Sequence, residues 1–424
     1  MNLYEKETIL VLGNGFDLAH DLPTSYVDFL KFAKIIQLFL EYEKKSGNDE
    51  GIFELELSKI DSNIAKMINN NMGDVRNTAK LEGNLFSQKD MWCDLLQNNF
   101  WIDHFQKAET LSDGWIDFEA EISKVINEVD NAIKKAEKNG DRLERFIEIY
   151  TLVMELKTRG QMVSKQNIVN FLFEQLIKMK RALELYLSDY VEEIDVFKRC
   201  EDILNLNPTK ILSFNYTNTY KRIYGKEDTI EYDYIHGIAN AKRDISNSNI
   251  VLGIDEYLDN DNKNKDLLFI EFKKYYQRLF YGCQRNAEDW CTDIKKDLEY
   301  EKAARKILYE DEISYRLLNE SSVGEELLNS FNYESRLRIE EKEFANRHPK
   351  HELIIFGHSL GVTDKDILQK LILNDNVHTT IYYHSKKSYS DQIKNLVRVI
   401  GQDELNKRTG GKYRTIEFKK ISDD

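Results

Sequence analysis

Residues 8–29 read TILVLGNGFDLAHDLPTSYVDF and contain the signal that decides the fold. The run Thr8–Leu12 is apolar and rich in β-branched residues, which predicts a short buried strand. Gly13 ends that strand and, with Gly15, allows a sharp turn in which the backbone approaches a ligand closely. The segment PTS at 23–25 then predicts a helix start, with its threonine or serine as the N-cap. The stretch therefore predicts a strand-turn-helix unit of an α/β protein.

Short apolar or β-branched runs predict further strands later in the chain. These runs are residues 210–214, 230–235, 250–254, 352–356 and 377–383. Helical periodicity follows the last two runs, at residues 364–373 and 389–400. Strands and helices thus alternate at both ends of the chain, which predicts a mostly parallel, Rossmann-like sheet flanked by helices.

Two long stretches carry helical periodicity instead, residues 50–205 and 261–349. The clearest helix faces in the first stretch consist of Phe118, Ile122, Val125, Ile126, Val129 and Ile133, and of Ile168, Phe171, Leu172, Leu176, Met179, Leu183 and Leu187. We therefore predict a nucleotide-binding α/β core made of residues 1–49, 206–260 and 350–424, interrupted by two large helical insertions.

The composition of the chain narrows the classes of function. A formal net charge of −14 over 424 residues argues against nucleic acid as a partner, because an acidic protein repels phosphate backbones. No run of about 18 apolar residues and no secretory signal pattern occurs, so we expect a cytoplasmic protein with no membrane partner. No C-x-x-C pair occurs among the four cysteines, which argues against a zinc site or a disulfide framework.

Polar residues follow several of the predicted strands, starting with Gly13-Asn14-Gly15. A G-x-G turn directly after a strand is typical of a loop that holds nucleotide phosphates, but a plain tight turn gives the same pattern. The third glycine of the full fingerprint is absent, since Leu18 occupies its position. The turn therefore indicates a nucleotide site only together with the other motifs.

Two further motifs place an amide and an imidazole at strand ends. Asn215, in SFNYT at 213–217, follows one predicted strand, and the edge of an open α/β sheet is where ligands bind. Asn215 is equally interpretable as a helix cap. His236, in DYIHG at 233–237, ends the next predicted strand and has the chemistry of a general base, although a structural histidine is the default interpretation.

The fourth motif, GHSLG at 357–361, lies between a predicted strand and a predicted helix. It matches the G-x-S-x-G nucleophile elbow, which would make Ser359 the nucleophile of a serine hydrolase. Acids and histidines that could complete a triad follow it. The elbow gives no role to the first three motifs, so we treat the hydrolase as an alternative.

Taken in order, the four motifs resemble the bacteriophage abortive-infection family AbiH, and they also resemble the sirtuin-type NAD-binding fold. GNGFDLAHDLPTSYVDF resembles the AbiH signature and the sirtuin glycine loop. SFNYT, IHG and GHSLGVTDKDIL are similar to the sirtuin asparagine, histidine and glycine–x–serine elements. WIDFE at 115–119 and VLGIDE at 251–256 are similar to segments of AbiH proteins.

The resemblance implies an anti-phage protein that hydrolyses NAD to nicotinamide and ADP-ribose, with Asn215 and His236 as catalytic residues. It implies nucleotide contacts from Gly13, Asn14, Gly15, Asp17, Thr24, Thr217, Gly357, His358, Ser359 and His384. NAD is then a substrate or ligand and not a retained cofactor, and no metal is expected. A phage-derived trigger and a homo-oligomer are further expected partners.

One departure from the sirtuin pattern bears on the activity. Thr217 stands where the asparagine element carries an acid, so position 217 does not supply the contact made by that carboxylate. A non-catalytic sensor of NAD or ADP-ribose is therefore a second alternative. The missing zinc module argues against protein deacetylation.

Overall fold

The computed structural model describes residues 6–46, 88–111, 116–225, 229–256, 265–283, 286–300, 302–303, 349–411 and 414–422. Predictions for the start of the first insertion, and for the second insertion from residue 304 to 348, lie outside the described residues.

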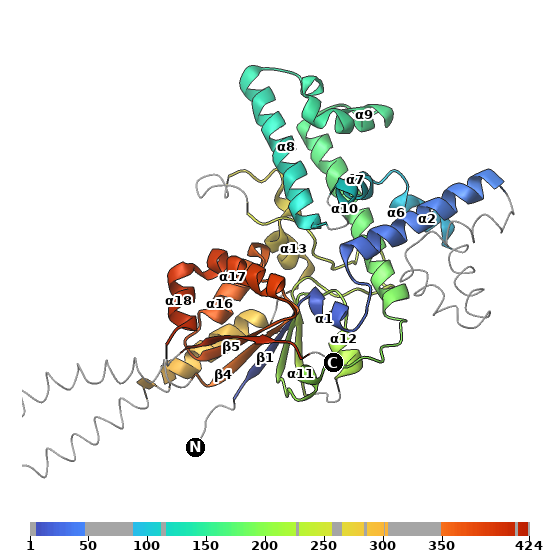
Figure 1. Ribbon diagram of the computed structural model, residues 1–424. Coiled ribbons are helices and arrows are strands. Elements are labelled where there is room, and N and C mark those ends of the chain that lie inside the picture. The colour runs from blue at the N-terminus through green and yellow to red at the C-terminus, as the bar shows by residue number, and fades with distance from the viewer. Residues whose placement is uncertain are drawn as a thin grey trace, which may run out of the picture.

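Six strands form one sheet in the order β3-β2-β1-β4-β5-β6, and every neighbouring pair is parallel (Figure 1). The strands are β1 (Thr8–Leu12), β2 (Lys210–Ser213), β3 (Glu231–Tyr234), β4 (His351–Phe356), β5 (Val377–Tyr383) and β6 (Ile416–Lys420). The predicted Rossmann-like parallel sheet is confirmed. The strand order reverses between β1 and β4, and open α/β sheets bind ligands beyond the carboxyl ends of the strands at such a point.

Strand β1 is apolar throughout because both of its faces are covered. Ile9 and Val11 pack into a core on one side of the sheet, and Leu10 and Leu12 pack into a core on the other side. This is the alternation of side chains that a strand imposes.

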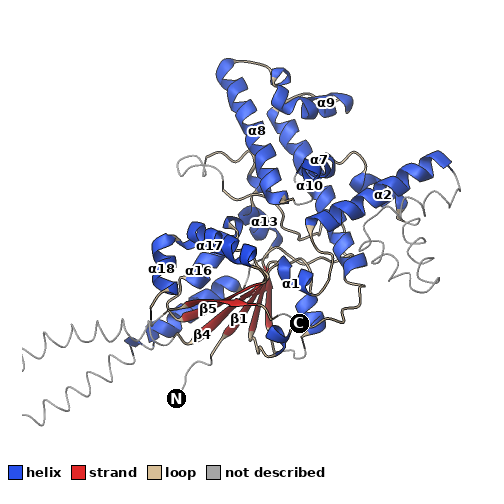
Figure 2. Cartoon of the chain, viewed as in Figure 1, coloured by secondary structure: helices blue, strands red, loops and turns tan. Residues whose placement is uncertain are grey.

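Helices cover both faces of the sheet (Figure 2). One side carries the short helices α1 (Asn14–Ala19), α11 (Glu201–Leu204) and α12 (Thr219–Ile223). The other side carries α16 (Lys365–Ile372), α17 (Lys386–Ile400), α18 (Gln402–Thr409) and a helix over residues 287–300. The α/β unit is therefore a three-layer arrangement.

A separate helical layer stands beyond the carboxyl edge of the sheet (Figure 1). It consists of α2 (Tyr26–Ser46), α6 (Lys89–Leu96), α7 (Phe100–Leu111), α8 (Phe118–Asn139), α9 (Tyr150–Thr158) and α10 (Lys165–Leu185), which continues as a π-helical turn over Tyr186–Val191. Short 3₁₀ turns at Leu143–Arg145 and Ile147–Ile149 join α8 to α9. All of the apolar positions predicted for the two helix faces are buried in this layer.

Helix α2 starts after Ser25, whose hydroxyl accepts a hydrogen bond from the N–H of Asp28 while the Asp28 carboxylate accepts one from the N–H of Ser25. This reciprocal pair caps the helix. Although α2 is close in sequence to β1, its side chains Phe29, Phe32 and Ile36 pack in the helical layer and not on the sheet.

The strand predicted at 250–254 is wrong. Its apolar side chains, including Ile250 and Leu252, are buried in the core of the helical layer. Among the described residues, its one ladder contact is an isolated bridge from Ile254 to Lys273. The side chain of Gln277 donates to the Leu252 carbonyl at 3.1 Å and accepts from the Leu252 N–H at 3.1 Å. A side chain thus supplies the hydrogen bonds that a neighbouring strand would otherwise supply.

Gln277 belongs to α13 (Lys274–Tyr281), which follows a 3₁₀ turn at Ile270–Phe272.

Strand β6 lies outside every run that the sequence predicts as a strand. The cysteines at 93, 200, 283 and 291 form no disulfide bond. In the described part of the chain, no helix combines the length and apolarity needed to cross a membrane.

Candidate functional site

The turn after β1 is packed against the turn after β4. A Cβ atom on Gly13 would lie 2.5 Å from Cα of His358, and one on Gly15 would lie 2.8 Å from Cα of Gly357. The N–H of Gly15 donates to the Gly357 carbonyl at 2.8 Å, and the N–H of Gly13 donates to the Phe356 carbonyl at 3.1 Å. Both glycines are therefore required for close packing of two strand ends, and both of their N–H groups are occupied.

Asn215 links the end of β2 to this turn. Its Nδ2 donates to the carbonyl oxygen of Gly13 at 3.0 Å, across 202 residues of sequence. The side chain is 6% exposed, and its Oδ1 has no hydrogen-bond donor among the described residues. The amide is thus held in one orientation with its oxygen unused.

Asp17, one turn into α1, lies beside the same loop. The hydroxyl of Thr217 donates to Asp17 Oδ2 at 2.5 Å, and the hydroxyl of Thr219 lies 3.1 Å from that of Thr217. Burial raises the pKa of Asp17 to about 6, although hydrogen bonds from these threonines oppose the shift. The other carboxylate oxygen, Oδ1, is buried with no donor among the described residues.

His236 follows β3 and is 5% exposed. Gly237 after it has a φ of 80°, and a Cβ there would lie 2.0 Å from the carbonyl oxygen of Asn249. A glycine is therefore needed for the chain to turn away directly after the histidine. The Ile235 N–H still donates to the Ser213 carbonyl at 2.9 Å, so the ladder with β2 extends up to His236.

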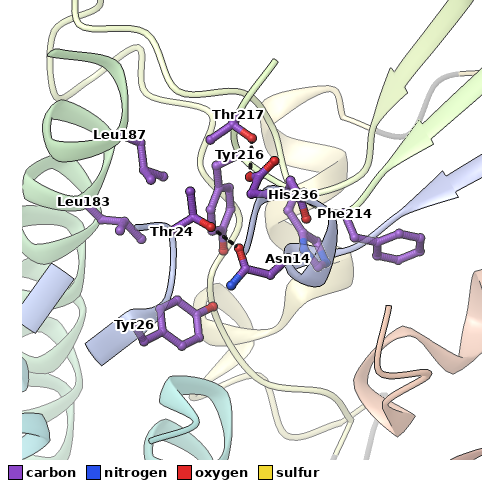
Figure 3. A pocket seen from close by; sticks show the side chains of 11 residues that line it. Asn14, Thr24, Tyr26, Leu183, Leu187, Phe214, Tyr216, Thr217 and His236 are labelled. Carbon is purple, nitrogen blue, oxygen red and sulfur yellow. Dashed lines mark hydrogen bonds between the residues drawn. The ribbon is translucent and has the colours of Figure 1, made fainter. Parts of the chain in front are cut away.

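These side chains meet in a cavity of about 120 Å³ at the carboxyl edge of the sheet (Figure 3). Its lining consists of Asn14, Asp17, Thr24, Tyr26, Leu183, Leu187, Phe214, Asn215, Tyr216, Thr217 and His236. The leucines come from α10 and its π-helical extension, so the helical layer forms one wall. The hydroxyl of Thr24 donates to Asn14 Oδ1 at 2.7 Å on the more exposed side.

A buried ionic network lies against His236. Its Nε2 is 3.1 Å from Asp364 Oδ1, although the angles do not meet those of a hydrogen bond. Lys274, which is 1% exposed, lies 3.4 Å from Asp364 Oδ1 and 2.7 Å from Glu119 Oε1. Burial by itself would raise the pKa of Asp364, but Lys274 and His236 hold it well below its usual range. Asp364 is therefore ionised beside the histidine.

Three separate segments supply the acids around Lys274. Glu119 ends the WIDFE segment, Asp255 belongs to VLGIDE, and Asp364 follows the GHSLG motif. Burial raises the pKa of Asp255 to about 7, and Lys274 opposes that shift. The motifs that resemble AbiH segments thus converge on one buried lysine.

The structure brings six of the twelve predicted site residues into the cavity: Asn14, Asp17, Thr24, Asn215, Thr217 and His236. The others do not line it. Gly13, Gly15 and Gly357 form the packed turns behind it. The ring of His358 meets that of Phe214 edge-on, with 4.4 Å between the ring centres, and its Nε2 lies 3.5 Å from Asp364 Oδ2. Ser359 and His384 are exposed.

Ser359 does not have the geometry of a nucleophile elbow. That motif places the nucleophile on a strained turn, whereas the left-handed residues here are Gly357 and Leu360, with φ of 69° and 59°. Among the described residues, no histidine hydrogen-bonds to the Ser359 hydroxyl. Its carbonyl accepts from Asn395 Nδ2 at 2.8 Å, which anchors the loop to α17.

Several residues of the site escape the sequence reasoning. Asp364 is one of the acids that follow the GHSLG motif, so the pattern indicates it only as a candidate for the triad of the alternative hydrolase. The pattern predicts packing roles, or no role, for Tyr26, Tyr216, Leu183 and Leu187. Asp364 sits within the GVTDKDIL segment, so the motif itself carries a signal for it. Lys274 has no signal, because a lysine in a charged helical stretch normally faces solvent.

Comparisons with known proteins identify the family. Searches of curated proteins and of solved structures give no match. The family model described as "Bacteriophage abortive infection AbiH" matches residues 9–384, which include β1 from its second residue, the SFNYT and DYIHG motifs and the GHSLG loop. The chain therefore belongs to the bacteriophage abortive infection family AbiH.

Proposed function

We propose that this chain contributes to abortive infection by hydrolysing NAD to nicotinamide and ADP-ribose in the cavity at the edge of its sheet, in the manner of a sirtuin-like NAD-binding core. Membership of AbiH gives the role in bacteriophage abortive infection. The proposal concerns the chemistry. One observation carries it: an amide and an imidazole from two different strand ends, Asn215 and His236, line the same cavity.

The reaction requires two things of the protein. Loss of nicotinamide leaves an oxocarbenium-like sugar, as in glycoside hydrolysis, so the ribose must be held while water or a ribose hydroxyl loses a proton. His236 is the proposed base, and such a base contributes roughly 10²–10⁴-fold to the rate. Asn215 would orient the ribose or the attacking water through its free Oδ1.

The buried network supports His236 in this role. An imidazole that accepts a proton becomes a cation, and the ionised Asp364 at 3.1 Å stabilises that cation. Lys274 compensates the charge of Asp364 when His236 is neutral. Asp364 and Lys274 are thus positioning residues that act through the histidine.

The size of the cavity limits what it encloses. A volume of about 120 Å³ is below the ~300–1,000 Å³ of typical small-molecule sites. It accommodates one ring of a dinucleotide, so the remainder of NAD would extend past Asn14 and Thr24 on the exposed side. The chain is then expected to need opening, or a partner, for efficient turnover.

A non-catalytic sensor of NAD or ADP-ribose is the second candidate, because Thr217 replaces an acid of the sirtuin pattern. The sensor would bind nucleotide in the same cavity without releasing nicotinamide. A serine hydrolase is disfavoured, since Ser359 lies outside the cavity and has no histidine partner among the described residues.

The test is incubation of the purified protein with NAD, with and without phage lysate, and measurement of free nicotinamide. His236→Ala and Asn215→Ala are expected to lose at least about a hundredfold in rate. His378→Ala is the matched control, because it removes an imidazole near the amino end of β5 that does not line the cavity. Nicotinamide release that is equal in all four proteins would refute the assignment, and bound NAD that is never cleaved would favour the sensor.

A further inference from the structure

Two buried oxygens in the cavity wall have no hydrogen-bond donor among the described residues. They are Oδ1 of Asp17, in a side chain that is 1% exposed, and Oδ1 of Asn215, in a side chain that is 6% exposed. Leaving such a group unpaired costs its full desolvation free energy, and the cost is larger when the group is charged. Two of them in one wall therefore indicate a place for a donor from outside the chain.

The donors beside these oxygens are already used within the protein. Thr217 donates to Asp17 Oδ2, Asn215 Nδ2 donates to the Gly13 carbonyl, and the Tyr216 hydroxyl donates to the Val251 carbonyl at 2.9 Å. None of the described lining residues is a lysine or an arginine. Apart from the imidazole of His236, which faces Asp364, the inner wall thus offers acceptors and a carboxyl group, and it offers no lysine or arginine.

Such a wall does not suit an anion. A phosphate brings only acceptor oxygens and negative charge, and it would meet the unpaired oxygens of Asp17 and Asn215 at close range. The backbone N–H groups of Gly13 and Gly15 do not offset this, because the carbonyls of Phe356 and Gly357 occupy them. The phosphates of a nucleotide therefore belong outside the cavity.

We propose that the cavity binds an uncharged ring that donates hydrogen bonds, either a sugar through its hydroxyls or an aromatic carboxamide through its NH₂, with Asp17 Oδ1 and Asn215 Oδ1 as the two acceptors. The inference deepens the proposed function, since NAD contains both kinds of group. It assigns recognition of the ring to Asp17 and moves the phosphates away from the turn at 13–15.

The same geometry accounts for Thr217. A carboxylate at position 217 would face the carboxylate of Asp17, which lies 2.5 Å from the present hydroxyl. Two buried like charges at that distance cannot both ionise. Asp17 thus supplies from α1 the carboxyl group that the asparagine motif lacks, and the threonine hydroxyl orients it.

The test measures binding in the background of His236→Ala, so that turnover does not interfere. Saturation-transfer NMR with nicotinamide and with D-ribose shows which ring enters, and NAD is titrated by calorimetry. Adding Asp17→Asn replaces an acceptor by a donor at the same size, and we expect the Kd for NAD to rise at least tenfold. Asp21→Asn, an exposed carboxylate just after α1, is the matched control and should leave the Kd unchanged. Inorganic pyrophosphate should not displace the ring that binds.

Two results would overturn the inference. One is displacement of the bound ring by pyrophosphate. The other is unchanged NAD binding in Asp17→Asn, which would mean that the two oxygens serve only the adjoining cavity of about 10 Å³, the room for a single water. NAD that binds as expected but is never hydrolysed by the unmutated protein would refute the proposed function alone. Hydrolysis with no effect of Asp17→Asn on binding would refute this inference alone.

Discussion

Replacing Asp17 by asparagine is expected to stabilise the protein, and to do so only above acidic pH. Burial raises the pKa of Asp17 from 3.8 to about 6. Below pH 3.8 the carboxyl group is protonated in both the folded and the unfolded state, so it carries no penalty. Between pH 3.8 and 6 the folded protein holds the proton more tightly than the unfolded chain, and stability falls as the pH rises.

The size of the effect follows from the shift. A change of about 2.2 pKa units, at 1.36 kcal/mol per unit, is about 3 kcal/mol. The asparagine side chain would keep an oxygen for the Thr217 hydroxyl, so the variant loses the buried charge and little else. We expect the Asp17→Asn protein to gain about 3 kcal/mol in free energy of unfolding at about pH 7, and only about 0.5 kcal/mol at about pH 4.

The assay is urea unfolding from about pH 4 to about pH 8, followed by the fluorescence of the buried tryptophans. Trp290 reports on the sheet, while Trp92 and Trp101 report on the helical layer. Asp21→Asn makes the same charge change on an exposed side chain and is the control. A stability gain of the same size at both ends of this pH range, or a loss at neutral pH, would show that burial does not destabilise the Asp17 carboxylate.

Three further predictions concern packing and the buried lysines. Gly13→Ala should cost about 1–3 kcal/mol in unfolding free energy, because its Cβ would lie 2.5 Å from the backbone of the turn after β4. Gly361→Ala is the control and should be close to neutral, because the nearest atom to its Cβ would be 3.5 Å away. Equal urea midpoints for the two variants would contradict this prediction. Lys274→Met should cost about 3–5 kcal/mol, since it leaves Asp364 buried without its lysine partner, and a thermal unfolding temperature equal to that of the unmutated protein would refute the ionic network. Lys180→Met should stabilise the protein at neutral pH by up to roughly 4 kcal/mol, because burial lowers the pKa of Lys180 from 10.5 to about 7. This gain in unfolding free energy should shrink as the pH rises toward 10.5. Urea midpoints of the two proteins at about pH 7 and about pH 9.5 measure it.

The local pattern was sufficient to predict the strands that position the site. Strand Thr8–Leu12 is found at the predicted residues, because a run that is buried on both faces is apolar at every position. Asn215 and His236 were predicted at the edge of the sheet because parallel strands bring their carboxyl ends together. Neither inference required knowledge of long-range contacts.

The two predictions that were wrong concern residues whose structure depends on a partner far away in the sequence. Residues 250–254 have the composition of a strand, yet their backbone groups bond to Gln277 and their side chains enter the helical layer. The turn at Gly13 has the pattern of an open phosphate loop, and its N–H groups are instead occupied by the turn after β4, more than 340 residues later. A local sequence pattern does not show which distant residue will bond to a backbone N–H or carbonyl group.

The helical layer is part of the site, because α10 and its π-helical extension are hydrogen-bonded to segments on two sides of the cavity. The Tyr186 hydroxyl donates to the carbonyl of Pro23 at 2.6 Å, next to Thr24 at the mouth. The carboxylate of Glu184, fully buried, accepts from the N–H of Asn240 at 3.2 Å, in the loop that follows His236. Leu183, beside these anchors along α10, lines the cavity itself. A shift of α10 relative to the sheet therefore changes the wall, the mouth and the loop behind the histidine together, so an event at the helical layer has a direct physical route to the proposed chemistry.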